Sequence, residues 1–428
     1  MKTQKLLFLW LLCCSTIPVF AQQGERFITI NGKILNETTK KAVEYANVRA
    51  VGTNIGTVCN EDGEFSLKIV DTLKVTEIEF SSLGFANKRL PLSDFFQNKS
   101  QSDVVTSGIN ASKIFKIIRL SPRTVVLSEV EVLGWENPQK LVETAIDRIE
   151  KNYPSSPALL TGFYRETVQK GKRYIDISEA VLSVYKNSYE SFYRTEKVQV
   201  LKGRRLVSPN LRDTLAVKLL GGPTSATSLD FVKNREIIFT KEDLQFYSFK
   251  MEGTATIDNR VQLMVSFSPK VQAENPLFSG TLYIDRETLA FSRIECSIQM
   301  TDKQKVTELV LRKKPLGLRF SPNEMNYTVS YRQIDGKFQL NYIRFELKFR
   351  CDWRRRLFAT NYVVVSEFVA TNSQTDNVEK IPGKSAFSSG KSLADEVSDY
   401  FDSDFWGAYN IIEPTESLER AVKFLKKK

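Results

Sequence analysis

The feature that most constrains the fold of this chain is a series of long, regular apolar segments in its second half, joined by short polar turns. Turns such as Asp335-Gly336 favour hairpins between neighbouring strands. Strands of about ten or more residues exceed the usual length and indicate a large curved sheet, able to wrap a helix or enclose an apolar groove. The predicted strands of this antiparallel meander are 262–268, 280–285, 289–300, 305–312, 324–333, 337–351 and 357–371.

A second group of strand and turn signals lies near the N-terminus. Residues 65–70 alternate apolar and polar side chains, which is typical of a strand with one solvated face. Residues 60–63 precede this strand, and Gly63 can adopt the positive φ that a tight loop requires. We therefore predict that strands at 56–58 and 65–70 pair as a hairpin across this loop. Asp62 is interpreted as a turn residue, because the loop lacks the alternating carboxylates of a calcium site.

Several motifs of this region occur in the order seen in a known family. They are Gly32-Lys33-Ile34, residues 42–48, residues 60–65 and Ser81-Ser82-Leu83-Gly84-Phe85. Together they resemble the carboxypeptidase regulatory-like domain, a seven-stranded prealbumin-type sandwich, over residues 27–120. The resemblance implies a structural or docking unit of exported bacterial proteins, without catalysis of its own.

The first 21 residues have the pattern of an export signal. Lys2 and Lys5 precede an apolar run at 6–12, and Ala21 ends a small-residue cleavage site, so the mature chain is expected to begin at Gln22. A lipid anchor on Cys13 or Cys14 is the alternative, but the residue before Cys13 is Leu rather than a small residue. We expect an exported protein that is periplasmic or outer-membrane-associated. No later stretch has the roughly 18 apolar residues of a membrane helix.

Composition excludes much catalytic chemistry. The 428 residues contain no His, which excludes imidazole-based nucleophile systems and nearly all zinc hydrolase sites. Cleavage of the signal leaves Cys59, Cys296 and Cys351, so at most one disulfide can form and buried strand thiols are expected. The sequence assigns no catalytic, cofactor-binding or metal-binding residue, and no cofactor.

The net charge is +11, and it becomes +9 when Lys2 and Lys5 are removed. In an exported protein this excess favours contact with an anionic membrane surface over nucleic acid. No aromatic and basic motif of a nucleic-acid module is present. The local clusters, each most simply a solvated face, are Arg204-Arg205, Arg312-Lys313-Lys314, Arg354-Arg355-Arg356 and Lys426-Lys427-Lys428.

Residues 121–136 are predicted to be a linker. Within it, 127–134 resembles the stretch that follows the same domain in TonB-dependent glycan-uptake transporters. Only 294 residues follow position 134, from 428 minus 134, too few for the plug and large barrel of such a transporter. We read 127–134 as a strand and linker, and a transporter-related outer-membrane component stays an alternative.

Residues 137–371 are predicted to be an antiparallel β domain that begins with a helix. Asn137 is a good N-cap and Pro138 suits the first helical position, before one apolar stripe that runs to Ile149. Strands are expected at 162–166 and 174–185, and residues 203–240 as an irregular insertion or lid. Residues 280–285 followed by 289–295 weakly resemble the half-barrel of lipoprotein carriers.

The remaining chain is divided into a polar linker, 372–404, and an aromatic segment with a helix, 405–428. Leu418, Ala421, Val422 and Leu425 have helical spacing, so this helix is expected to dock back onto the domain or to bind a partner. The fold class is therefore mainly β: an N-terminal seven-stranded prealbumin-like sandwich, then a large curved antiparallel β domain with a few helices.

Two functional hypotheses follow. The leading one is a non-enzymatic envelope protein whose β domain binds a partner protein or an amphipathic ligand. The alternative is a carboxylate-based envelope glycoside hydrolase. Its candidate acid pairs are Asp176 with Glu179, or Glu346 with Asp352.

Overall fold

The computed structural model describes most of the chain. The predicted signal at 1–21 and the predicted strand at 127–134 lie outside the described residues. No helix within the described part is long and apolar enough to span a membrane. The described residues are 26–96, 114–123, 137–191, 196–210, 215–238, 240–271, 275–354, 358–389, 391–397 and 405–426.

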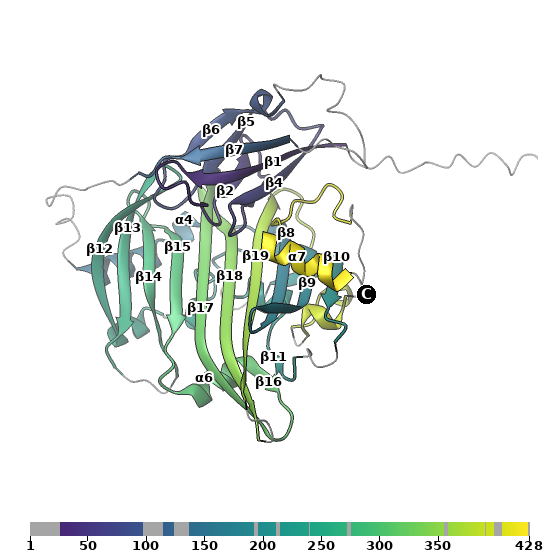
Figure 1. Ribbon diagram of the computed structural model, residues 1–428. Helices are drawn as coiled ribbons and strands as arrows, with labels where there is room; N and C mark the ends of the chain where they lie inside the picture. Colours follow the sequence, from purple (N-terminus) through teal and green to yellow (C-terminus); the bar gives the residue numbers. More distant parts are fainter. Residues whose placement is uncertain are drawn as a thin grey trace, which may run out of the picture.

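The N-terminal domain is a two-sheet β-sandwich (Figure 1). One sheet has the order β4-β1-β7 and the other β3-β2-β5-β6, so the described residues supply the seven strands that the sequence predicts. Phe65, Phe80 and Phe95 pack between the sheets. The strands are β1 (Phe27–Asn36), β2 (Asn47–Ala50), β3 (Gly56–Val58), β4 (Glu64–Val70), β5 (Glu77–Ser81), β6 (Lys88–Pro91) and β7 (Ile114–Leu120), with a short 3-10 helix η1 (Leu92–Phe95).

The predicted pairing of β3 with β4 is wrong. The loop at 60–63 is a tight turn with Gly63 at φ +77°, but it carries the chain from one sheet to the other. Cys59 N donates to Ala46 O at 2.9 Å beside β2, whereas Ile34 N of β1 donates to Gly63 O at 2.8 Å. Each end of the loop is thus bonded to a different sheet, and the two flanking strands separate.

The second domain is built on one curved ten-stranded antiparallel sheet, in the order β10-β9-β8-β19-β18-β17-β15-β14-β13-β12 (Figure 1). The chain forms β8 to β10, crosses to the far edge at β12, and returns until β19 pairs with β8. The strands are β8 (Ala158–Lys170), β9 (Arg173–Lys186), β10 (Lys197–Val207), β12 (Tyr247–Ile257), β13 (Arg260–Pro269), β14 (Phe278–Asp285), β15 (Phe291–Ile298), β17 (Leu318–Ile334), β18 (Lys337–Trp353) and β19 (Thr360–Gln374).

One predicted strand, 305–312, is wrong. Helix α6 (Lys303–Val310) occupies most of this range, followed by the short strand β16 (Leu311–Lys313), which pairs with β11 (Lys218–Leu219) outside the main sheet. Asp302 caps the helix by accepting from the backbone N of Gln304 and Lys305 at 2.9 and 3.1 Å. Val306 and Val310 are buried one turn apart, as a short helix requires.

The predicted helix at the start of this domain is confirmed as α3 (Pro138–Asp147) and α4 (Ile149–Asn152). Asn137 Oδ1 accepts from Lys140 N at 3.2 Å, and Pro138 occupies the first turn. The buried apolar stripe of these helices packs into the core on the inner face of the sheet. Other short helical elements are α5 (Pro223–Thr227), η5 (Arg235–Ile237), η6 (Glu242–Phe246), η7 (Gly383–Ser385) and η8 (Leu393–Asp395).

The end of the chain packs against both domains. Helix α7 (Glu416–Lys426) docks back, as predicted, with Leu418 and Leu425 against Ile177 of β9 and Leu206 of β10. Lys68 N of β4 donates to Asn410 Oδ1 at 2.7 Å and Lys68 O accepts from Asn410 Nδ2 at 2.9 Å, so residue 410 is bonded to the open backbone edge of β4. Part of the predicted polar linker is also bonded to the sheet, since Phe387 N donates to Val198 O of β10 at 2.6 Å.

Candidate ligand pocket

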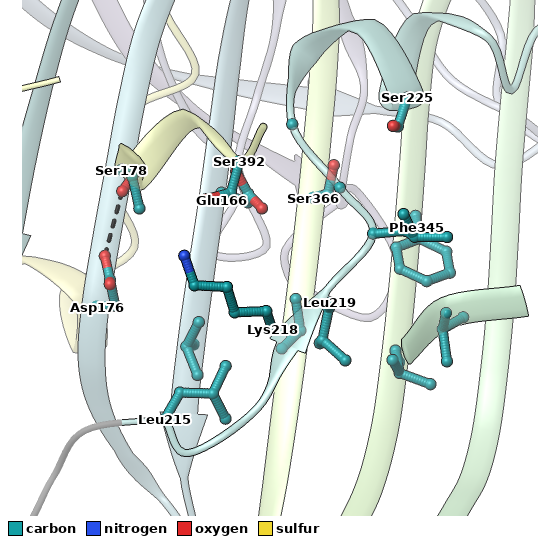
Figure 2. Close-up of a pocket in the computed structure, with 18 of the residues that line it drawn as sticks. Glu166, Asp176, Ser178, Leu215, Lys218, Leu219, Ser225, Phe345, Ser366 and Ser392 are labelled. Carbon is teal, nitrogen blue, oxygen red and sulfur yellow. Dashed lines mark hydrogen bonds between the residues drawn. The ribbon is translucent and has the colours of Figure 1, made fainter. Parts of the chain in front are cut away.

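A pocket of about 430 Å³ lies between the inner face of the sheet and a covering segment, residues 215–229 (Figure 2). This volume is within the range of small-molecule sites. The predicted insertion at 203–240 therefore divides into two parts: 203–207 belong to β10, and the part after 215 forms the outer wall of the pocket.

Most of the sheet wall of the pocket is apolar. Successive strands contribute every second side chain to it, as the two-residue period of a strand dictates. The covering segment adds Leu215, Val217 and Leu229, and α6 adds Leu309 and Val310 at the rim. The apolar residues from the sheet are Val168, Ile175, Val207, Met325, Tyr327, Phe345, Leu347 and Val364.

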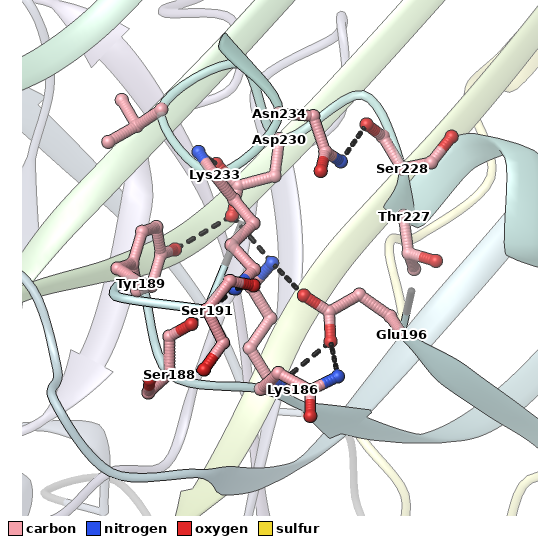
Figure 3. Close-up of polar contacts among 12 residues, drawn as sticks. Lys186, Ser188, Tyr189, Ser191, Glu196, Thr227, Ser228, Asp230, Lys233 and Asn234 are labelled. Atoms are coloured by element: carbon pink, nitrogen blue, oxygen red, sulfur yellow. Dashed lines mark hydrogen bonds and ion pairs between the residues drawn. The ribbon is translucent and has the colours of Figure 1, made fainter. Parts of the chain in front are cut away.

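The covering segment is held in place by a buried carboxylate just beyond the pocket (Figure 3). Asp230 is fully buried and accepts from the hydroxyls of Tyr189 and Tyr331, each at 2.7 Å. Lys186 Nζ pairs with it at 2.7 Å and also with Glu196 at 3.0 Å. Burial alone would raise the pKa of Asp230, but Lys186 and the two tyrosines hold it below its ordinary value. The wall is therefore anchored at one defined position.

The backbone before that anchor depends on Gly222, which has φ +87°. A Cβ built there would lie 2.4 Å from Lys391 O. This close approach brings the segment around Ser392 to the edge of the pocket, where Ala394 and Asp395 also contribute.

Polar side chains gather at one end of the pocket. Arg205 of β10 forms an ion pair with Asp176 of β9, with Nη2 to Oδ2 at 2.6 Å. Ser178 Oγ donates to the same carboxylate at 3.1 Å. Lys218 lies 3.6 Å from Asp395 across the rim, and its long side chain extends along this end in Figure 2. The pocket is thus amphipathic.

Glu166 of β8 completes this polar end. Its Oε2 is buried and has no hydrogen-bond partner within the described part of the chain. Burial raises the pKa of Glu166 to about 7, and the nearby charge of Asp176 acts in the same direction. The pocket therefore contains one carboxyl group whose charge changes near neutral pH.

The acid pairs predicted from sequence are not brought together. Asp176 faces the pocket, whereas Glu179 lies on the opposite face, paired with Arg165 at 2.8 Å and Arg204 at 2.6 Å. Glu346 and Asp352 are six residues apart on β18, which corresponds to about 20 Å along a strand.

The carboxyl that sequence reasoning missed is Glu166. It lies diagonally opposite Asp176 across β8 and β9, because Val168 is the registered partner of Asp176. Both strands were predicted, but their register depends on a bulge between Val168 and Gln169 that no local pattern signals.

The basic clusters have different environments. Arg204 and Arg205 are used internally, in the ion pairs with Glu179 and Asp176. Arg312, Lys313, Lys314 and Arg354 are exposed at the end of the sheet away from the N-terminal domain. Residues 355–357 and 427–428 lie outside the described residues.

The cysteines are buried, unpaired thiols, as predicted: Cys59, Cys296 and Cys351. Burial raises the pKa of Cys59 to about 12 and that of Cys351 to about 11, which keeps both thiols protonated. Within the described ranges, no three Cys, Asp or Glu side chains gather as metal ligands.

Comparison with known proteins bears on the N-terminal domain first. Residues 30–132 match the family model described as CarboxypepD_reg-like domain. This confirms the resemblance. The match spans the CarboxypepD_reg-like domain only, so it identifies no function for the ten-stranded sheet. No curated protein matches the chain.

Several solved structures resemble the chain at low identity. A DUF1329 family protein from Desulfovibrio piger has 13% identity and a TM-score of 0.25, covering 57% of this chain and 95% of its own. A LolA superfamily protein from Nitrosomonas europaea has 10% identity and a TM-score of 0.21, covering 56% and 95%. MucB, in complex with MucA(peri), has 11% identity and a TM-score of 0.17, covering 56% and 99%. Similarity at this level carries no argument about activity.

Proposed function

We propose that this protein is an exported, non-enzymatic envelope protein that binds an amphipathic ligand in the pocket on the inner face of its sheet. The observation that carries the proposal is the division of the pocket into an apolar wall and a polar end around Glu166, Asp176 and Arg205. An acyl chain would lie along the apolar wall, with its polar group at these side chains.

The pocket wall supports binding without requiring a large rearrangement. Asp230 fixes the covering segment through three charged or hydroxyl partners, so the cavity exists before ligand arrives. A preformed cavity reduces the ordering cost of binding. The signal-like residues 1–21 and the CarboxypepD_reg-like domain support an envelope location for this activity.

Binding of a fluorescent fatty acid tests the proposal. We expect saturable enhancement of its emission by the full chain. Ser225 lies on α5 and faces the pocket, so Ser225→Trp should weaken binding by at least about tenfold, because the indole would fill the volume that the chain needs.

The matched control is Ser248→Trp, which places the same ring on an exposed position of the edge strand β12. This variant should bind like the parent. Absence of binding by the parent, or equal binding by the Ser225 variant, would reject the pocket as the site.

One observation favours a second candidate, a glycoside hydrolase. Glu166 and Asp176 both face the pocket from diagonal positions of the neighbouring strands β8 and β9. Glycosidases use two carboxyl groups that flank the bond to be cleaved, and the raised pKa of Glu166 suits the acid of such a pair. Product release from envelope polysaccharides that is lost in Glu166→Gln, with probe binding retained, would favour the enzyme over the binding protein.

A further inference from the structure

The end of the sheet opposite the N-terminal domain carries large apolar side chains in open solvent. Leu316, in the turn between β16 and β17, is fully exposed, and Phe358, in the connection from β18 to β19, is 83% exposed. The two connections are neighbours, because Arg354 N donates to Gly317 O at 3.2 Å. Exposed apolar side chains at adjacent turns are a feature of surfaces that meet another apolar phase.

Cations surround these two side chains. None of these cations forms an ion pair with another described residue. Asp352 is the single acidic residue in the stretches 311–320 and 350–354. We refer to Leu316, Phe358 and these cations as the tip surface. The exposed cations are Arg312, Lys313, Lys314, Arg319, Arg350 and Arg354.

A further turn reaches the same end of the sheet. Gly171 N, between β8 and β9, donates to Asn361 O at the start of β19 at 2.9 Å. This turn adds the side chains of Lys170, Lys172 and Arg173 to the positive end. Figure 1 shows this end, near α6 and β16, at the bottom of the molecule, with the N-terminal domain at the top.

We infer that the tip surface docks on an anionic lipid bilayer. Leu316 and Phe358 would enter the interface between head groups and acyl chains, while the cations contact the lipid phosphates. Charge complementarity selects this partner over a neutral surface, because the six cations at this end of the sheet form no ion pair with an acidic side chain among the described residues. Side chains projecting singly from turns also suit a fluid phase better than a rigid partner protein, which would need a shaped cavity for each.

The tip surface is continuous with the mouth of the pocket. Leu309 and Leu220, both about half exposed, line the rim, and Leu220 N donates to Val310 O at 2.8 Å. Arg312 belongs to both the tip surface and the pocket lining. Docking would therefore place the pocket mouth beside the bilayer. The inference about the lipid surface stands independently of what the pocket binds.

Co-sedimentation of the full chain with vesicles tests this inference. We expect binding to phosphatidylcholine vesicles that contain phosphatidylglycerol, loss of binding as salt is raised, and little binding to phosphatidylcholine alone. The double variant Lys313→Gln with Lys314→Gln should weaken binding by about fivefold for each cation removed. The double variant Leu316→Ser with Phe358→Ser should also weaken it, at every salt concentration.

Matched controls come from the opposite end of the molecule. Lys41→Gln with Lys74→Gln removes two exposed cations, and Phe115→Ser with Ile117→Ser removes two exposed apolar side chains of β7. Both should bind vesicles like the parent.

Equal losses of vesicle binding in the tip and control variants, or no vesicle binding by the parent, would overturn the inference. Sedimentation velocity tests whether the tip surface instead binds a second copy of this chain. Self-association of the parent that is abolished in the Leu316→Ser, Phe358→Ser variant would overturn the inference. The tip variants should still bind the fluorescent fatty acid like the parent. Loss of vesicle binding with fatty-acid binding retained would test the lipid-surface inference independently of the pocket proposal.

Discussion

Arg165 of β8 donates a hydrogen bond through Nη2 to the carbonyl oxygen of Ile412 at 2.7 Å. Arg165 is 3% exposed, and its guanidinium also pairs with Glu179. On the other side of the same segment, Thr57 Oγ1 of β3 donates to Ile411 O at 2.9 Å. Residues 405–412 therefore lie between the two domains and are bonded to both, while Trp406 packs edge-on against Phe163 of β8.

The first prediction concerns the charge beneath this segment. Glu179→Gln should lower the free energy of unfolding by about 3–5 kcal/mol, because it leaves Arg165 and Arg204 buried without their counterion. Urea unfolding of the full chain measures the change. Glu419→Gln is the control, since its partner Lys423 is 3.7 Å away on an exposed helix face, and it should cost less than about 0.5 kcal/mol. Similar losses in both variants would contradict the assigned role of Glu179.

The anchor of the pocket wall gives a second prediction. Tyr189→Phe removes one hydrogen bond to the buried carboxylate of Asp230, and should cost about 1.5–3 kcal/mol in unfolding free energy. Tyr409→Phe, at a partly exposed position without a described hydrogen bond from its hydroxyl, should change stability by less than about 0.5 kcal/mol. A Tyr189 variant as stable as the parent would show that Asp230 does not depend on this donor.

Glu166 should make stability depend on pH. Its pKa in the folded chain is about 7, above the ordinary value of 4.5. The unfolded chain therefore loses this proton first, so the contribution of Glu166 is fully present below about pH 4.5 and is lost as the pH rises through 7. Glu166→Gln removes this loss, and its melting temperature relative to the parent should rise between pH 4.5 and 8. Parallel pH profiles for the two proteins would mean that the carboxyl is not perturbed.

Two glycines of the N-terminal domain have similar positive φ angles but different surroundings. Comparing their substitutions distinguishes the cost of backbone strain from the cost of a steric contact. Gly63 and Gly84 have φ +77° and +79°, but a Cβ at Gly63 would lie 2.5 Å from Ile34 O, whereas at Gly84 it would meet nothing within 4 Å. Gly84→Ala should cost about 1 kcal/mol for the left-handed conformation alone. Gly63→Ala should cost about 2–3 kcal/mol, because β1 must also move. Equal midpoints in urea would contradict the close approach.

Local signals in the sequence predicted individual helices, strands and turns better than they predicted which strands pair with each other. Asn137 and Pro138 define the start of α3, and Asp335-Gly336 forms the hairpin turn of β17 and β18 with φ +48° and +79°. The range 305–312 was misassigned because periodicity does not distinguish a helix from a strand in a short apolar segment. Asp302, the N-cap of the helix, was the local signal that indicated a helix start.

The candidate site was less accessible to sequence reasoning, because its residues come from distant segments. Glu166, Asp176 and Asp395 meet only after β8 and β9 pair with their bulge and the segment after β19 folds back over the inner face. The separation of Asp176 from Glu179 follows from strand alternation alone, once their strand is known. The inward position of Glu166 depends on register, which tertiary packing decides.

The pairing of β8 with β19 has a consequence for how the protein is made. Lys170 is the registered partner of Tyr362, so the sheet is divided until almost all of the chain has been synthesised. The strands on either side of this seam can form hairpins early, but joining them closes a loop of nearly two hundred residues, which is slow. During that interval two unpaired strand edges are open to other chains. Biogenesis of this protein therefore has a vulnerable period that ends only when β19 reaches β8 and residues 405–412 settle between the domains.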